Sequence, residues 1–248
     1  MVTLLLIISH FIGDFVLQSS KMAVEKRQHF LKLLEHCALY TFVSAAVLFI
    51  STDFRNSVGA AVIIGISHLV VDYARIFIDK KVAAHAQIFC YFFDQILHLG
   101  VIFVVSCYFH LDIHPGGFLQ SALYVFGKAN INNGIIYMLV YLVMLQPAAV
   151  TVKKVLSHIS SRKYDDKDEY RVTNYNVGYT IGILERIIAA TLVLQNQLST
   201  VGLVLAAKSL ARFNQLNDRE FAEKYLVGTL TSIAISIIAT LILKKMLL

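Results

Sequence analysis

Long apolar stretches separated by short polar connections make up most of the sequence. A helix needs about 20 apolar residues to cross a hydrocarbon core of about 30 Å, and most of these stretches are long enough. The first and seventh are shorter, and residues 118–126 are expected to lie at the membrane interface. The pattern predicts an all-α protein, a polytopic bundle of about seven or eight transmembrane helices. The eight stretches are residues 2–18, 32–51, 57–78, 86–109, 133–151, 176–196, 199–213 and 222–243.

Composition supports a membrane protein. Hydrophobic residues make up 57% of the chain and charged residues 15%, with a mean hydropathy of +0.67. Soluble proteins have about 45–50% apolar and about 25% charged residues, so a soluble domain is excluded. The net charge of +6 does not indicate nucleic-acid binding, because the cations gather in connections after alternate stretches. This alternation predicts an external N-terminus and basic cytoplasmic loops.

We expect one integrated membrane domain with two parts. Residues 1–112 form an N-terminal four-helix module that carries histidines and aspartates. Residues 113–248 form C-terminal membrane helices, with a cytoplasmic loop near residues 155–175.

Ionisable residues recur inside the first four apolar stretches. A His and an Asp lie four residues apart in the first, third and fourth, which places both on one helix face. The second stretch carries a further His. With a rise of about 1.5 Å per residue, all of them fall roughly 6 to 18 Å from the cytoplasmic helix ends. The set is His10, Asp14, His36, His68, Asp72, Asp94 and His98.

Buried carboxylates at this depth need partners. A lone charge at the centre of a spanning helix costs about 2.5–3.5 kcal/mol, and we expect no matching cation nearby. This cost would be removed either by a bound divalent metal or by protonation of the carboxyl groups with hydrogen bonds to the histidines. One His–Asp pair is more often a structural hydrogen bond, but the shared depth favours metal. Imidazole and carboxylate suit zinc first, with manganese or iron as alternatives. Seven candidates exceed the roughly four ligands of one zinc, so one or two ions are expected, with some candidates outside the coordination sphere.

Cations gather in the sixth and seventh stretches. Lys208 and Arg212 lie four residues apart, and Arg186 follows Glu185. They either form ion pairs that stabilise helix packing or bind the phosphate of a lipid headgroup.

The chain resembles bacterial membrane proteins of domain of unknown function 3307. The likeness is carried by HFIGDFVLQSSKMA, the second-stretch histidine, SHLVVDYAR and FFDQILHL. Further on, GILERIIAATLVL, AAKSLARF and FAEKYLVGTLTS are similar to longer members. The resemblance implies a multi-pass protein of the bacterial inner membrane and no particular activity. More loosely, the His/Asp arrangement is similar to inner-membrane proteins described as metal-dependent hydrolases.

The leading hypothesis is a membrane-embedded, metal-dependent hydrolase of an anionic, phosphate-containing lipid or lipid-linked substrate. A metal-bound water would attack, with Asp94 or Asp14 as general base. Gln18 and Gln95 would donate hydrogen bonds to the metal ligands, and the three cations would hold the phosphate. A cation- or proton-coupled transporter is the first alternative, and a non-enzymatic scaffold or sensor the second. Membrane lipids are the expected partners; the substrate and the oligomeric state stay open.

Overall fold

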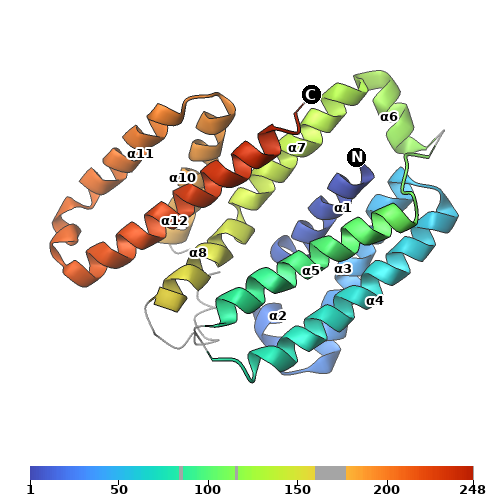
Figure 1. The fold of residues 1–248 in the computed structure, drawn as a ribbon, viewed down its shortest axis with the longest axis horizontal. Coiled ribbons are helices and arrows are strands. Elements are labelled where there is room, and N and C mark those ends of the chain that lie inside the picture. Colours follow the sequence, from blue (N-terminus) through green and yellow to red (C-terminus); the bar gives the residue numbers. More distant parts are fainter. Residues whose placement is uncertain (84–85, 115–116, 160–176, 248) are drawn as a thin grey trace. The chain divides into compact units, whose positions relative to one another are not determined.

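The computed structural model describes residues 1–83, 86–114, 117–159 and 177–247. Every regular element within these residues is a helix, which confirms the predicted all-α class (Figure 1). The chain divides into two compact units: residues 1–135, and residues 136–159 with 177–247. Most of the loop predicted near residues 155–175 lies outside the described residues.

The first unit contains four long helical segments and two short helices. A π-helical turn, η1, continues the first helix, and α2 and α6 are short. Two of the helices have N-cap side chains. The Ser19 side chain accepts a hydrogen bond from the backbone N–H of Met22 at the start of α2, and the Asp53 side chain accepts one from Asn56 at the start of α4. These contacts satisfy N–H groups that have no partner within the helix. The elements are α1 (Val2–Phe11), η1 (Ile12–Val16), α2 (Ser20–Glu25), α3 (Phe30–Ser51), α4 (Phe54–Asp79), α5 (Gln87–Tyr108) and α6 (Phe118–Phe126).

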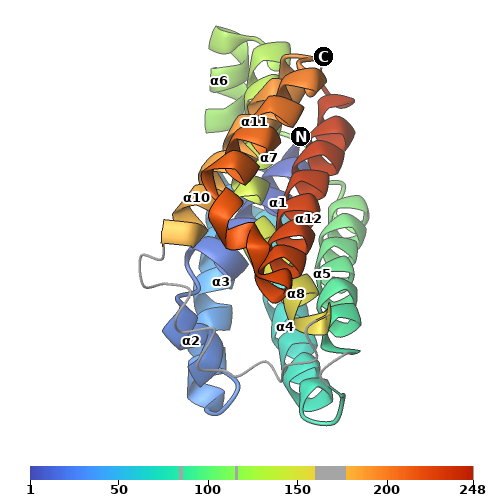
Figure 2. The same cartoon turned by 90° about the vertical axis from the view of Figure 1, so that its left-hand side faces the viewer.

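In this unit α1 packs against α3 and α5, and α4 packs against α3 and α5. The start of α3 and the end of α4 lie at the same end of the unit, so the two helices are antiparallel (Figure 2). A buried apolar cluster that includes Leu6, Leu48, Ile64 and Ile102 joins the helices. Large apolar side chains cover the outside instead of polar ones, as hydrocarbon solvation requires.

The second unit is built around α10 and α12. The helix α12 packs on α8 and α10, and α10 also packs on α11. Two small buried clusters, one around Val140 and Ala190 and one around Val201 and Ile233, fill the contacts. The helix α7 begins in the first unit and continues into this one. The elements are α7 (Lys128–Met144), α8 (Gln146–Ile159), α10 (Val177–Leu194), α11 (Leu198–Ala211), η3 (Phe213–Asn217) and α12 (Arg219–Lys244).

Five helical segments of the described residues are long and apolar enough to cross a membrane: α3, α4, α5, Lys128–Ile159 and α12. Val2–Val16 and Leu198–Ala211 are apolar but shorter. The chain therefore has the character of a membrane protein, while the expected count of seven or eight spans is not confirmed. The predicted fifth stretch, residues 133–151, is interrupted at Leu145, because Pro147 has no N–H to continue the helical hydrogen bonds.

Candidate metal centre

The first helix delivers Asp14 to the interior through a change of helix type. The backbone N–H of Leu17 donates to the carbonyl of Ile12 at 2.8 Å, a hydrogen bond that spans five residues and defines the π-helical turn. Such turns are rare in proteins as a whole, and those that occur often lie at functional sites. Asp14 lies in the middle of this turn and is buried.

A close approach of α3 holds this turn in place. A Cβ atom on Gly13 would lie 2.7 Å from Cδ2 of Tyr40, so only glycine fits there. The Tyr40 ring in turn stacks on the imidazole of His68, with ring centroids 3.6 Å apart and an interplanar angle of 5°. Gly13 and Tyr40 thus position an aspartate and a histidine of the centre, and periodicity alone gave no sign of either contact.

Two histidines face each other between two carboxylates. The Nε2 atoms of His36 and His68 lie 3.1 Å apart. Oδ1 of Asp14 lies 3.5 Å from each of them. Oδ2 of Asp72 lies 3.4 Å from Nε2 of His36 and 3.8 Å from Nε2 of His68. Ligands about 2.0–2.1 Å from a tetrahedral ion lie about 3.3–3.4 Å from one another, so each carboxylate oxygen has nearly the spacing of a ligand from the two imidazole nitrogens.

A third histidine approaches Asp72 from α5. Nδ1 of His98 donates to the backbone carbonyl of Asp94 at 2.9 Å, which leaves the Nε2 lone pair facing Oδ1 of Asp72 at 3.9 Å. Nε2 of His98 and Oδ1 of Asp94 are buried and have no hydrogen-bond partner among the described residues. Nε2 of His98 and Oδ1 of Asp72 are thus two hydrogen-bond acceptors that face each other in a buried site, and such a pair needs a cation or a proton between them.

His10 shows the same pattern. Its Nε2 lies 3.3 Å from Oε1 of Gln95, an atom that only accepts hydrogen bonds, so the ring donates there. Nδ1 of the neutral ring is then an acceptor, and it faces Oδ2 of Asp14 at 3.7 Å. Gln95 also donates from Nε2 to Oδ2 of Asp94 at 3.1 Å, so it orients two predicted ligands. Gln18, predicted for the same role, has a buried Oε1 without a partner in the described part of the chain.

The seven predicted ligands therefore lie in one buried cluster, which we call the His/Asp centre. The histidines are almost completely buried, and Asp14 and Asp72 are at most 9% exposed. Three overlapping trios each offer ligand atoms that all lie within 4.8 Å of one another. The trios are Asp14, His68 and His98; His36, His68 and Asp72; and Asp72, Asp94 and His98. The Nδ1 atoms of His36 and His68 lack a partner among the described residues.

The expectation that no cation lies near these carboxylates is wrong. Nζ of Lys26 lies 2.7 Å from Oδ2 of Asp72, and Nη1 of Arg75 lies 3.9 Å from Oδ2 of Asp94. Lys26 belongs to the connection after α2, and its long side chain reaches back into the unit, which hydropathy cannot reveal. Arg75 is divided between Asp94 and Asp79, to which it donates at 2.7 Å.

Lys26 is a cation in this setting. Burial is the largest single influence and acts to lower the pKa of Lys26, but the Asp72, Asp14 and Asp94 carboxylates together raise it more, and the net shift is upward. Asp72 therefore has a counter-charge without metal. The close ionisable partners of Asp14 are the histidines His10, His36 and His68.

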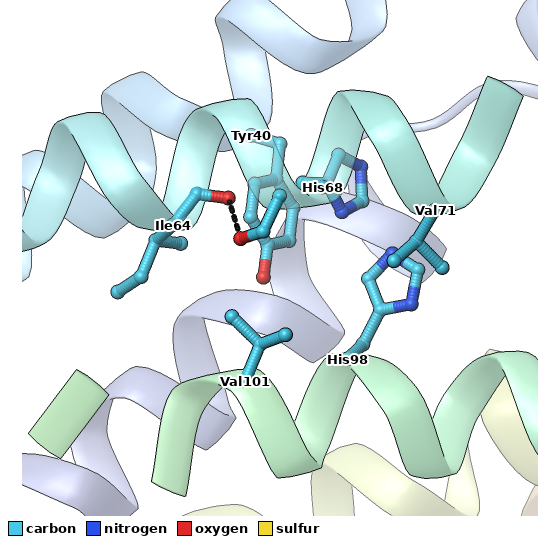
Figure 3. Close-up of a pocket in the computed structure, with 7 residues that line it drawn as sticks. Tyr40, Ile64, His68, Val71, His98 and Val101 are labelled. Atoms are coloured by element: carbon cyan, nitrogen blue, oxygen red, sulfur yellow. Dashed lines mark hydrogen bonds between the residues drawn. The ribbon is translucent and has the colours of Figure 1, made fainter. Parts of the chain in front are cut away.

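A pocket with about 180 Å³ of empty space, its open side included, lies beside the centre between α4 and α5. The imidazoles of His68 and His98 lie toward one side of it and Ile64 toward the other (Figure 3). Val71 and Val101 complete its apolar wall.

The three cations predicted to bind substrate lie in the second unit. Nε of Arg186 donates to the carbonyl of Met144 at 2.7 Å, and this buried guanidinium satisfies the helix end that the break at Leu145 exposes. Nζ of Lys208 pairs with Glu185 at 2.6 Å. Arg212 is half-buried and donates to Gln215. In this structure Arg186 and Lys208 thus make the packing contacts of the first interpretation.

The comparisons with known proteins identify a family. The profile of the family described as Protein of unknown function (DUF3307) matches residues 2–126, half of the chain, and this range contains the whole His/Asp centre. The segments expected to resemble longer members lie beyond the matched range. No curated protein and no solved structure matches the chain, so the likeness to metal-dependent hydrolases gains no support here. The chain belongs to the DUF3307 family.

Proposed function

We propose that this protein is a membrane-embedded, metal-dependent hydrolase that acts on an anionic, phosphate-containing lipid or lipid-linked substrate. One observation carries the proposal: buried imidazole nitrogens and carboxylate oxygens from four helical segments face one another at 3.1–3.9 Å. One or two divalent ions would bind these atoms as ligands, and zinc suits the donor set best, with manganese or iron as alternatives.

The residues divide the work as follows. His36, His68 and Asp72 offer the best-spaced ligand atoms, with Asp14 close to both imidazoles. His10 faces Asp14 and His98 faces Asp72, and these two imidazole rings stack on each other. A divalent ion at this place supplies an activated water at neutral pH, because coordination lowers the pKa of water toward about 7. Asp94 keeps an unpartnered Oδ1 beside the cluster, and it is the carboxylate that accepts the proton when Asp14 is a ligand.

The membrane location and the pocket support a lipid substrate. The pocket brings an apolar wall and two imidazoles together, a combination that suits a substrate with an apolar part next to its polar group. Lys26 and Arg75 add positive charge at the edge of the centre, which favours an anionic group. Binding of phosphate by Lys208, Arg186 or Arg212 remains a prediction, and for Lys208 it requires exchange of the Glu185 pair.

Hydrolysis is tested with the purified protein in lipid nanodiscs. The assay follows phosphate release from phosphatidic acid and from an isoprenyl diphosphate, with added Zn²⁺ or Mn²⁺. We expect turnover that His68→Ala abolishes and that His29→Ala, a change at an exposed histidine before α3, leaves intact. Turnover that is unchanged in His68→Ala would show that the His/Asp centre does not catalyse the reaction.

Transport is the second candidate, and the interruption of the first helix by the π-helical turn favours it, because transporter sites lie at broken helices. The continuous helices α3, α4 and α5 argue against it. Uptake of a radioactive divalent cation or of protons into proteoliposomes, lost in Asp72→Asn, would establish transport instead. A scaffold or sensor, the third candidate, predicts neither turnover nor uptake.

A further inference from the structure

We infer that the His/Asp centre holds two divalent ions bridged by Asp72. In the metal-free protein the Lys26 ammonium group pairs with Asp72 in place of one of these ions. This inference deepens the proposed function and rests on it. It sets the number of ions and the chemical class of the reaction, hydrolysis of a phosphate ester or anhydride.

The first ion position lies among His36, His68, Asp14 and Asp72. Oδ2 of Asp72 is the oxygen that faces it, at 3.4 Å and 3.8 Å from the two Nε2 atoms. The opposite side is closed by Oδ1 of Asp14, at 3.5 Å from both. His36, His68 and Asp72 thus supply three ligand atoms within 4.8 Å of one another, and Asp14 approaches the two imidazoles from the other side.

The second position uses the other oxygen of the same carboxylate. Oδ1 of Asp72 faces Nε2 of His98 at 3.9 Å, and Asp94 completes a trio whose ligand atoms lie within 4.8 Å of one another. Nε2 of His98 and Oδ1 of Asp94 are both buried and unpartnered among the described residues. The first position already uses His36 and His68, and a second ion would give both of these atoms a ligand role.

The divided orientation of Asp72 is what indicates a bridge. A carboxylate that binds one ion through each oxygen suits the separation of about 3.5–4 Å found in two-metal hydrolytic sites, which stabilise the attacking and leaving oxygens of phosphoryl transfer. With Asp94 on the second ion, that carboxylate is no longer free to act as the general base that a one-ion site would use, and activation of the water would then rest on the two ions.

Lys26 explains how the centre stays folded without metal. Its ammonium group lies 2.7 Å from the same Asp72 oxygen that faces the first position. An ion that enters this position competes with Lys26 for that oxygen, because a cation and the ammonium group repel each other at such distances. Binding of the first ion therefore requires the Lys26 side chain to move away.

The test is a Mn²⁺ titration of chelator-treated full-length protein in nanodiscs, read by electron paramagnetic resonance and by metal analysis. We expect two Mn²⁺ per chain with a spin-coupled spectrum. Asp94→Asn should retain one uncoupled ion, and Asp72→Asn should lose the coupling. Asp218→Asn is the matched control, because Asn caps the start of α12 as well as Asp does, and it should keep both ions.

Lys26 provides an independent readout. Lys26→Met should lower the Kd of the first Mn²⁺ by about tenfold, since a hydrogen bond to a charged group no longer has to be broken. Lys26→Arg, which keeps the charge, should not. A Kd that is unchanged in Lys26→Met would overturn the competition.

Other outcomes separate this inference from the proposed function. One Mn²⁺ per chain, or two without coupling, would overturn the bridged pair while a one-metal hydrolase stands. A coupled pair without turnover on any lipid phosphate would support the bridge and remove the hydrolase. A chain that binds no Mn²⁺ and no Zn²⁺ would overturn both.

Discussion

Substitution of Gly13 by alanine tests how the π-helical turn is held against α3. The added Cβ would lie 2.7 Å from Cδ2 of Tyr40 and 3.4 Å from its Cα. The ring cannot retreat, because it is 1% exposed and stacks at 3.6 Å on the buried imidazole of His68. The turn, with Asp14 next to the substituted residue, has to move instead.

The magnitude follows from this overlap. Overpacking of a filled interior costs about 1–3 kcal/mol, and the rigid stack places Gly13→Ala in the upper half of that range. Alanine is intrinsically better than glycine in a helix by about 1 kcal/mol, so the net loss is about 1–2 kcal/mol. Metal affinity should fall as well, because Asp14 is displaced from the two imidazoles that it faces.

The assay is equilibrium unfolding in mixed detergent micelles, together with Mn²⁺ binding. Gly100→Ala is the matched control: it lies within α5, and an added Cβ there meets nothing within 4 Å, so its stability should stay equal or rise. Adding Tyr40→Leu to Gly13→Ala should recover part of the loss, a coupling of about 0.5–3 kcal/mol. Equal stability of Gly13→Ala and Gly100→Ala, with equal Mn²⁺ affinity, would refute the reasoning.

Three further predictions concern other parts of the molecule. Arg186→Gln should lower the free energy of unfolding by about 1–3 kcal/mol because buried carbonyls lose their donor, whereas Arg219→Gln, at an exposed ion pair, should stay within about 0.5 kcal/mol in the same denaturation assay. Lys26→Met should destabilise the metal-free protein by about 3–5 kcal/mol by leaving a buried carboxylate unpaired; Mn²⁺ should restore the loss in thermal unfolding, and a loss that Mn²⁺ leaves unchanged contradicts the site. Val101→Phe should fill the pocket and reduce turnover of the lipid substrate with metal content unchanged, and full activity would show that the substrate does not use the pocket.

The arrangement of the His/Asp centre follows from features that a sequence displays. Spacing of four residues puts His68 and Asp72 on one face of α4. Short connections make successive helices antiparallel, so His and Asp residues at the same distance from the helix ends come to lie close together. The polar residues could be found because hydrocarbon surroundings make ionisable groups exceptional.

The remaining features depend on contacts between distant segments. Lys26 follows a short helix in a basic connection, and only the folded chain shows that its side chain turns inward. The close approach of Gly13 to Tyr40 likewise depends on how the helices pack, and no hydrophobic periodicity in the sequence predicts it. Pro147 is visible in the sequence, but the apolar residues around it led us to predict one continuous stretch. The predicted number of spans is not confirmed, because a hydropathy pattern does not show where short apolar helices end.

The most direct test of the central claim is the transition-metal content of the protein purified without added metal or chelator. The account predicts about two ions per chain, zinc foremost, and a clear reduction in Asp72→Asn and His98→Ala. Less than about one tenth of an ion per chain in a folded wild-type protein that also fails to take up added Zn²⁺ or Mn²⁺ would contradict it.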